Sequence, residues 1–288
     1  MRIALLLGVW LAWAPARAAN LAPLRADLPV DLSLTAGGGA LWLGSELLFK
    51  GALAPSRCRW CDADAAGRDT LDGFDRTLRD ALRWKNPATA DALSNVGAFG
   101  LVPLVALGGV ALAGHRDGAE LSTVGTDLLV IAEAAVLAQD LNQAVKFAAG
   151  RERPFVHAMD PAEKSLTAHP DDNNLSFFSG HTTWVFALAT AAGTVSAMHG
   201  YRATPWIWAG GLTLATAVGV LRVGADKHYA TDVLMGALVG TAFGVGVPLL
   251  FHRPPPAGRA PMPGAGQALA MSLSPERGGL SMSVGGHF

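Results

Sequence analysis

Three short stretches of the sequence, 146–154, 178–181 and 222–232, carry side chains that suit the handling of a phosphate group. They supply three cations, two imidazoles, a hydroxyl beside a glycine and one carboxylate: Lys146, Arg153 and Arg222; His181 and His228; Ser179 and Gly180; and Asp232. These are the groups needed to hold a phosphate and to transfer it through a phosphorylated histidine.

The cations and the Ser-Gly pair predict a phosphate-binding site. Arg153 and Arg222 can each present a planar fork of N–H donors, and Lys146 adds a point charge. Ser179 and Gly180 precede an apolar segment that we expect to be helical. The unpaired backbone N–H groups of a helix N-terminus favour an anion, and a glycine lets the backbone come close to it.

The two histidines and the carboxylate predict the chemistry. His228 and Asp232 are four residues apart, so on a helix they share a face. A carboxylate on one imidazole nitrogen would fix the tautomer and leave the other nitrogen as a nucleophile. His181, at the start of another helix, would protonate the leaving oxygen. Three fixed cations would stabilise the transition state, so the sequence predicts neither a metal nor a cofactor.

Each of these residues also has a plain structural interpretation. Lys146 and Arg153 could anchor a membrane helix at the headgroups, His228 and Asp232 could be an ordinary helix-start pair, and His181 could face water. The occurrence of all these residues together favours a phosphate-handling site over the structural interpretations. If successive helices alternate in direction, all three stretches arrive at the same end of a bundle.

The composition favours a membrane-embedded helical protein. Of the 288 residues 51% are apolar and 16% are charged, the mean hydropathy is +0.31, and a net charge of −1 gives no reason to expect nucleic acid as a partner. Five segments are predicted helices near the length that crosses a bilayer: Val96–Gly114, Leu121–Ala149, Thr182–Met198, Pro205–Leu221 and Val233–Phe251. We therefore expect an all-α bundle of about six helices that crosses the membrane several times. A soluble helical bundle is the alternative.

The sequence divides into four regions. Residues 1–18 are typical of a signal peptide. Residues 19–92 hold an apolar helix, Leu34–Leu53, and a polar segment with a predicted helix at Leu71–Trp84. Residues 93–252 form the core bundle, and residues 253–288 are a proline-rich linker followed by a small predicted β-hairpin. Behind a signal peptide, Cys58 and Cys61 favour a local disulfide or idle thiols over a redox motif.

The three stretches resemble the motifs of the type-2 phosphatidic acid phosphatase superfamily, K-x6-RP, PSGH and SR-x5-H-x3-D. The resemblance covers roughly residues 93–252, with Phe178 in place of the usual proline and Leu221 in place of the usual serine. It implies a bundle of six helices with Leu34–Leu53 as the first. It also implies His228 as nucleophile, Asp232 as its partner and His181 as acid. The implied phosphate ligands are Lys146, Arg153, Ser179, Gly180 and Arg222.

The resemblance leaves several functions open. A phosphatase for a lipid phosphate or diphosphate, in contact with membrane lipids, is the first expectation. The alternatives are a soluble periplasmic acid phosphatase, a vanadate-dependent haloperoxidase and a non-catalytic protein that binds lipid phosphate. We expect an inner-membrane protein with its site facing the periplasm, which requires Leu34–Leu53 to be peripheral or re-entrant. His157 and His169 lie between the first two motifs and could shape the entrance or simply be solvated.

Overall fold

The structure, a computed structural model, describes residues 21–64, 66–160, 162–253, 270–276 and 279–285. The chain divides into two units, Met1–Arg253 and Pro254–Phe288. The predicted signal peptide, residues 1–18, and the linker at 254–269 lie outside the described residues.

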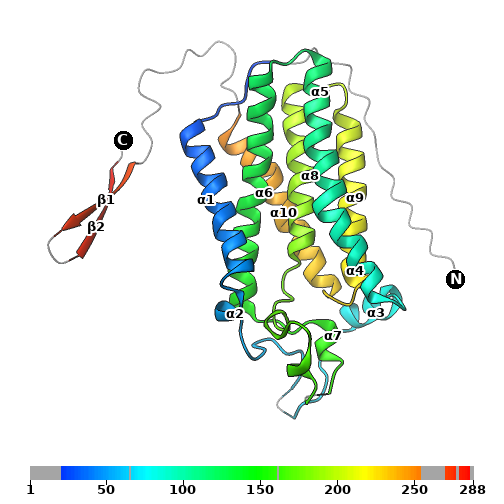
Figure 1. The fold of residues 1–288 in the computed structure, drawn as a ribbon. Helices are drawn as coiled ribbons and strands as arrows, with labels where there is room; N and C mark the ends of the chain where they lie inside the picture. Colours follow the sequence, from blue (N-terminus) through cyan, green and yellow to red (C-terminus); the bar gives the residue numbers. More distant parts are fainter. Residues whose placement is uncertain (1–20, 65, 161, 254–269, 277–278, 286–288) are drawn as a thin grey trace. The chain divides into compact units, whose positions relative to one another are not determined.

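The first unit is a bundle of long helices that run up and down one axis (Figure 1). One of the long segments is continuous over 87–117 and includes two π-helical stretches. The long elements are α1 (Leu28–Leu47), then α4 (Pro87–Val96), η1 (Gly97–Leu101), η2 (Leu104–Gly108) and α5 (Gly109–Asp117) in series, then α6 (Leu121–Ala149), α8 (Gly180–His199), α9 (Thr204–Gly224) and α10 (Ala230–Phe251). The predicted all-helical bundle is thereby confirmed for this unit.

Short helices and loops gather at one end of the bundle, where α7 and α3 lie in Figure 1. They are α2 (Lys50–Leu53), α3 (Gly73–Leu82), α7 (Pro154–His157), η3 (Lys164–Leu166) and η4 (Pro170–Asp172). The predicted helix at Leu71–Trp84 corresponds to α3. The apolar helix expected from Val96 instead begins at Pro87, because Asn86 caps it and Pro87 occupies its first turn.

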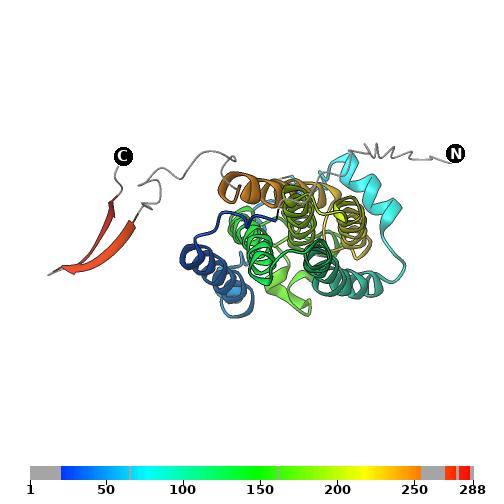
Figure 2. The same ribbon diagram turned by 90° about the horizontal axis from the view of Figure 1, so that it is seen from above.

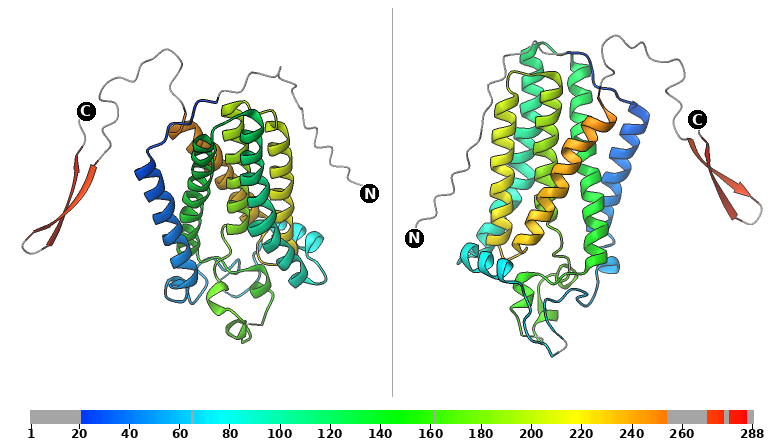
Figure 3. Two further views of the ribbon diagram at one scale, coloured as in Figure 1. Left: turned by 45° about the horizontal axis from the view of Figure 1, so that its top comes forward. Right: turned by 180° about the vertical axis from the view of Figure 1, so that it is seen from behind.

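Helix α8 forms the centre of the bundle, packed against α6, α9 and α10 (Figure 2). Helix α10 crosses behind it on a diagonal (Figure 3). The contact face of α10 carries Gly236, Gly240 and Gly244, and a Cβ added to any of them would overlap atoms of α8. Small residues at this four-residue spacing let two helix backbones approach closely. The start of α10 is therefore held beside the start of α8.

Four helical segments are long and apolar enough to cross a membrane: 87–117, 121–149, 204–224 and 230–251. Their outward positions include exposed leucines such as Leu104, Leu234 and Leu238. Helix α8, which the sequence analysis counted as a span, is not among the four, and neither is α1. Other helices enclose α8, so its threonines do not face lipid. The chain is a membrane protein.

The second unit contains β1 (Ala270–Glu276) and β2 (Gly279–Gly285), which pair antiparallel from Ala270 opposite Gly285 to Glu276 opposite Gly279. An isolated two-stranded ribbon is marginally stable in water. The pairing by itself therefore does not establish a folded hairpin, and the C-terminal hairpin stays a prediction.

Candidate active site

The three stretches meet around one cavity of about 230 Å³, at the end of the bundle where the short helices gather. Helix α6 ends there, α8 begins, α9 ends and α10 begins. Six of the eight residues singled out from the sequence line it: Lys146, Arg153, Gly180, His181, Arg222 and His228. Ser179 and Asp232 are fully buried behind its wall.

Two of the three cations keep N–H donors unpaired. Nη1 of Arg222 donates to Asp91 and to the Ser94 hydroxyl, but its Nε is buried without a hydrogen-bond partner. Nζ of Lys146 makes no hydrogen bond with any residue that the structure describes. A buried donor without a partner costs roughly 1–3 kcal/mol. An anion in the cavity would satisfy both groups.

Arg153 is held by the loop that closes the site. Its Nε donates to the backbone carbonyl of Asp172 at 2.7 Å and its Nη1 to that of Lys227 at 3.2 Å. Burial raises the pKa of Asp172, but the nearby Arg153 and Lys50 outweigh it, so the pKa of this carboxyl lies below its usual value. The anionic Asp172 therefore also bonds Lys50, at 3.2 Å, and ties α2 to the loop.

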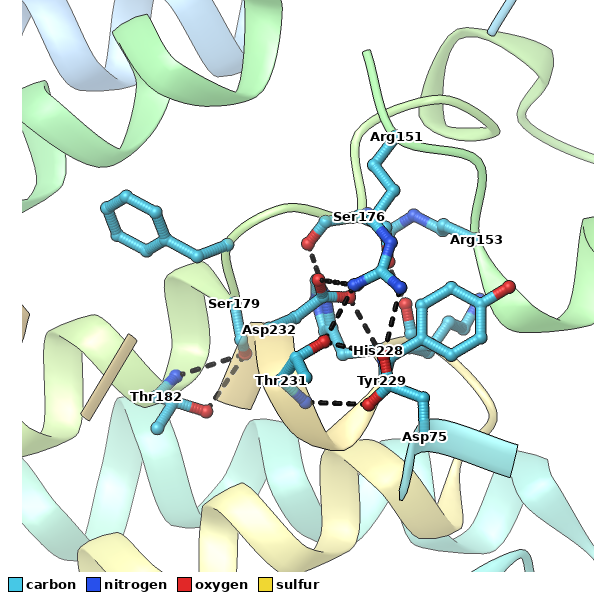
Figure 4. Close-up of polar contacts among 12 residues, drawn as sticks. Asp75, Arg151, Arg153, Ser176, Ser179, Thr182, His228, Tyr229, Thr231 and Asp232 are labelled. Atoms are coloured by element: carbon cyan, nitrogen blue, oxygen red, sulfur yellow. Dashed lines mark hydrogen bonds and ion pairs between the residues drawn. The ribbon is translucent and has the colours of Figure 1, made fainter. Parts of the chain in front are cut away.

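The turn before α8 supplies Gly180 and Ser179 in different roles. A Cβ on Gly180 would lie 2.9 Å from Asn142 Oδ1 and 3.1 Å from Lys146 Nζ, so only glycine lets both groups approach the wall. Ser179 caps α8, its Oγ accepting from the backbone N–H and the hydroxyl of Thr182 (Figure 4). Both contacts use Oγ as an acceptor, so the expected phosphate contact of the Ser179 hydroxyl stays a prediction.

His228 has a defined tautomer. Its Nδ1 lies 2.8 Å from the carbonyl oxygen of Ser176, which can only accept, so Nδ1 carries the proton and Nε2 keeps a lone pair. Burial of the ring, together with the charges of Arg153 and Arg222, lowers the pKa of His228 well below its usual range. The imidazole is therefore neutral near neutral pH, and its Nε2 lone pair is free of a proton.

Asp232 does not bond His228 directly, which differs from the sequence expectation. The nearest approach, from Oδ2 to Nδ1, is 3.8 Å. Instead Oδ2 accepts from the Ser176 hydroxyl at 2.6 Å and from the backbone N–H of Tyr229 at 3.0 Å (Figure 4). As the third residue of α10, Asp232 is used as a helix cap. It reaches the imidazole through Ser176, which bonds both.

Behind Asp232 lies a buried arginine that the sequence analysis did not single out. Nη1 of Arg151 donates to Asp232 at 2.7 Å and Nη2 to Asp75 at 2.9 Å (Figure 4). The guanidinium lies between the rings of Trp60 and Tyr229, at 4.3 and 4.1 Å from their centroids. Buried charges of this kind need such partners. The segment around Trp60 also contains the Cys58–Cys61 disulfide, one of the two expected states of these cysteines.

His181 stands at the cavity wall on the first turn of α8. Its Nε2 is 2.6 Å from Asn95 Oδ1 on α4, so Nε2–H donates to the amide oxygen. The edge of Phe99 packs against the ring, with centroids 5.1 Å apart. These contacts fix the imidazole where it faces the same cavity as His228.

The two loop histidines do not line the cavity. His157 lies 3.4 Å from Glu152 and 3.2 Å from Asp69, and these carboxylates, against the effect of burial, raise its pKa. His169 is exposed. His157 therefore braces the loop.

Sequence reasoning missed the side chains that hold the site: Asp75, Asn95, Asn142, Arg151 and Ser176. Helical spacing could have indicated Asn142, because it lies one turn before Lys146 on α6. Another signal was available for Arg151, which follows Gly150 two residues before Arg153. The remaining three are ordinary polar residues whose partners are far away in sequence.

The family comparison matches residues 127–255 to the PAP2 superfamily. These residues, just under half of the chain, are similar to the PAP2 superfamily. The matched range contains every site residue that the sequence analysis named. It begins after Asp75 and the disulfide segment, which nevertheless complete the contacts of Arg151.

Two curated proteins are similar to parts of the chain. One is the lipid A 1-phosphatase of Porphyromonas gingivalis, 41% identical over 69 residues, which are 24% of this chain and 15% of that protein. Another is the bacitracin transport permease protein BcrC of Bacillus licheniformis, 35% identical over 107 residues, 37% of this chain and 47% of that protein. The matched part spans less than half the length of either relative.

Among solved structures, a transmembrane PAP2-type phosphatidylglycerolphosphate phosphatase from Bacillus subtilis is 18% identical, with a TM-score of 0.44. The alignment covers 75% of this chain and 93% of that one.

Proposed function

We propose that the chain is a phosphatase for a lipid phosphate or diphosphate that works through a phosphohistidine and needs no metal. The observation that carries the proposal is the cavity itself: three cations and two imidazoles face it, and the buried Nε of Arg222 has no partner there. The PAP2 relatives include a lipid A 1-phosphatase, which supports a lipid phosphate as substrate.

The first proposed step is attack of the His228 Nε2 lone pair on phosphorus. The bond from phosphorus to the ester oxygen breaks, and His181, protonated on both ring nitrogens beside the bound phosphate, gives that oxygen its Nε2 proton and becomes neutral; Asn95 holds this N–H in the free protein. Lys146, Arg153 and Arg222 balance the charge on the transferring group. Water then gives a proton to His181 and attacks phosphorus, which releases phosphate and restores neutral His228.

Binding alone would not explain the arrangement around His228. A phosphate-binding protein gains nothing from a neutral imidazole whose Nδ1–H is fixed by a carbonyl that is itself positioned by Asp232. A nucleophile requires both features, since the lone pair must point outward and the ring must stay neutral. This is why we favour catalysis over the non-catalytic alternative.

The experiment is phosphate release by the full chain, purified in detergent, from phosphatidic acid, a polyprenyl diphosphate and a soluble aryl phosphate, with EDTA present. The variant His228→Ala should lose at least about 1,000-fold in kcat. The matched control His169→Ala, an exposed loop histidine, should keep the activity of the unchanged protein.

An alkaline quench, which preserves phosphohistidine, should trap label on the unchanged protein and none on His228→Ala. Activity that survives this substitution contradicts the mechanism, and so does a requirement for added metal in protein that stays folded with EDTA present. A strong preference for the aryl phosphate would instead favour the broad-specificity acid phosphatase.

A further inference from the structure

A second cluster of ionisable side chains lies at the opposite end of the bundle. Asp31 stands in the first turn of α1, Glu133 in the first half of α6 and His252 directly after α10. All three are buried, with exposed fractions of 7%, 3% and 2%. One ligand atom of each lies within 4.8 Å of the others. None of the three lines the phosphate cavity.

The tautomer of His252 points its lone pair into this cluster. Nδ1 lies 2.9 Å from the carbonyl oxygen of Arg25, which can only accept, so Nδ1 carries the proton. In the neutral ring Nε2 therefore keeps its lone pair, and it faces Glu133 Oε2 at 3.5 Å. Histidines that bind a metal commonly donate their other N–H to a backbone carbonyl in this way.

Two atoms of the cluster are buried without a hydrogen-bond partner, His252 Nε2 and Glu133 Oε2. A neighbouring buried carboxylate on α6 shows the contrast. Both oxygens of Asp127 are paired, one with His199 Nε2 at 2.8 Å and the other with the Tyr201 hydroxyl at 3.0 Å. In the cluster, Asp31 Oδ2 accepts from the backbone N–H of Asp27 at 2.9 Å, so the atoms without a hydrogen-bond partner are those of Glu133 and His252.

We propose that Asp31, Glu133 and His252 bind a divalent transition-metal ion of the Zn²⁺ class. Two carboxylates and a neutral imidazole carry two negative charges, which a divalent cation balances. An imidazole nitrogen with carboxylate oxygens is a donor set that suits zinc. The ion would accept the lone pair of Nε2 and the orphaned oxygen of Glu133 together.

The proposed ion has a structural role, because its ligands come from three helices. Zinc takes nitrogen and oxygen ligands at about 2.0–2.2 Å, and the ligand atoms here, which all lie within 4.8 Å of one another, need to move only a little closer to reach such an ion. Binding would therefore draw the start of α1 against α6 and the end of α10. The backbone contacts between Arg25 and His252 already join these segments, so little rearrangement is needed.

The competing interpretation is a shared buried proton instead of a metal. The test uses the tag-free full chain in detergent, stripped with EDTA, dialysed and titrated with ZnCl2. We expect about one tight zinc ion per chain by elemental analysis, and a higher melting temperature after reloading. In His252→Gln and Glu133→Gln the affinity for zinc should fall strongly. Loss of a residue that only supports a metal ligand costs roughly 10- to 100-fold, and loss of a ligand itself should cost more.

Two control variants make the result specific. His115→Gln changes an exposed histidine at the same end, and His228→Ala removes an imidazole of the phosphate cavity; both should still bind the ion. Substoichiometric zinc in the unchanged protein, or an equal affinity in His252→Gln, overturns the proposal. If the ligand variants do not fold, the wild-type protein still tests the proposal. Equal melting temperatures of its stripped and zinc-loaded forms would overturn the zinc site.

Discussion

At the scale of single residues, the site depends on a histidine kept neutral among cations. Ser176 is the link, because its carbonyl fixes the proton on Nδ1 of His228 while its hydroxyl bonds Asp232. The carboxylate therefore acts on the imidazole through an intermediate residue. The surrounding positive charge disfavours a further proton on the ring.

The protonation of His228 can be measured directly by NMR with ¹³C-labelled histidine, its signal being assigned by its loss in His228→Gln. Burial and the nearby arginines lower the pKa of His228. We therefore expect the ring to stay neutral as the pH falls through about 6.5, the usual histidine value, and to gain its proton only below it. Bound phosphate should raise this pKa. A value above 6.5 in the free protein would contradict the electrostatic account.

Arg151 and Asp75 are positioning residues for Asp232. Replacing Asp75 by Asn removes one of the carboxylates that hold the guanidinium while keeping the shape of the side chain. A small displacement of catalytic groups can cost about 100-fold in rate, so we expect kcat to fall by up to that factor with KM little changed. Asp69→Asn, in the same segment but half-exposed, is the control. Equal kcat values for the two variants would show that Asp75 only supports the fold.

How far the sequence predicts the site depends on whether a residue acts alone or through a distant partner. The motif spacing brought Lys146, His181 and His228 to one cavity, because helix alternation alone decides which end each reaches. It could not predict that Asp232 contacts Ser176 instead of His228. That contact depends on how the turn before α8 folds over the start of α10, and nothing in the local spacing encodes it.

At the scale of elements, the glycine face of α10 brings the two halves of the site together. Gly240 lies against the carbonyl of Thr183, four residues beyond Ser179 on α8. The backbone N–H of Ser179 in turn donates to the carbonyl of Asp232. Close packing of α8 and α10 thus sets the distance between the turn that carries His181 and the turn that carries His228.

Gly240→Ala and Gly246→Ala form a matched pair on this helix. A methyl group at Gly240 would overlap α8, whereas one at Gly246 would meet nothing within 4 Å. We expect Gly240→Ala to lower the free energy of unfolding by about 1–3 kcal/mol and to reduce activity. Gly246→Ala should be neutral or slightly stabilising, because alanine favours helix. Thermal unfolding in detergent measures both, and equal stabilities would argue against tight α8–α10 packing.

The helices themselves were largely predictable from hydropathy, with two instructive exceptions. The helix that begins at Pro87 was expected only from Val96, because its first residues are polar enough to resemble a loop. Helix α8 was expected as one of the apolar spans, but its central place in the bundle was not. Its burial by α6, α9 and α10 is a tertiary property that a hydropathy profile does not contain.

At the scale of the whole molecule, we predict the orientation in the membrane from what lies at each end. The site end carries the Cys58–Cys61 disulfide, which forms in oxidising compartments such as the periplasm. The other end carries Arg116, Arg202 and Arg253, and positive residues favour the cytoplasmic side. Both features support a site that faces the periplasm. Helix α1 runs from the arginine end to the site end alongside α6 (Figure 1).

Cysteine labelling in intact cells tests this orientation in a protein whose own cysteines are replaced by serine. Ser165→Cys, exposed in the site-end loop, should react with a membrane-impermeant maleimide in intact cells, and His115→Cys, exposed at the other end, only after lysis. The reverse pattern would place the site in the cytoplasm. Ala26→Cys, just before α1, then tests whether the signal peptide is cleaved and whether α1 crosses the bilayer. Labelling in intact cells requires a cleaved signal peptide and an α1 that does not cross the bilayer, whereas protection means that α1 crosses it and residues before α1 stay inside.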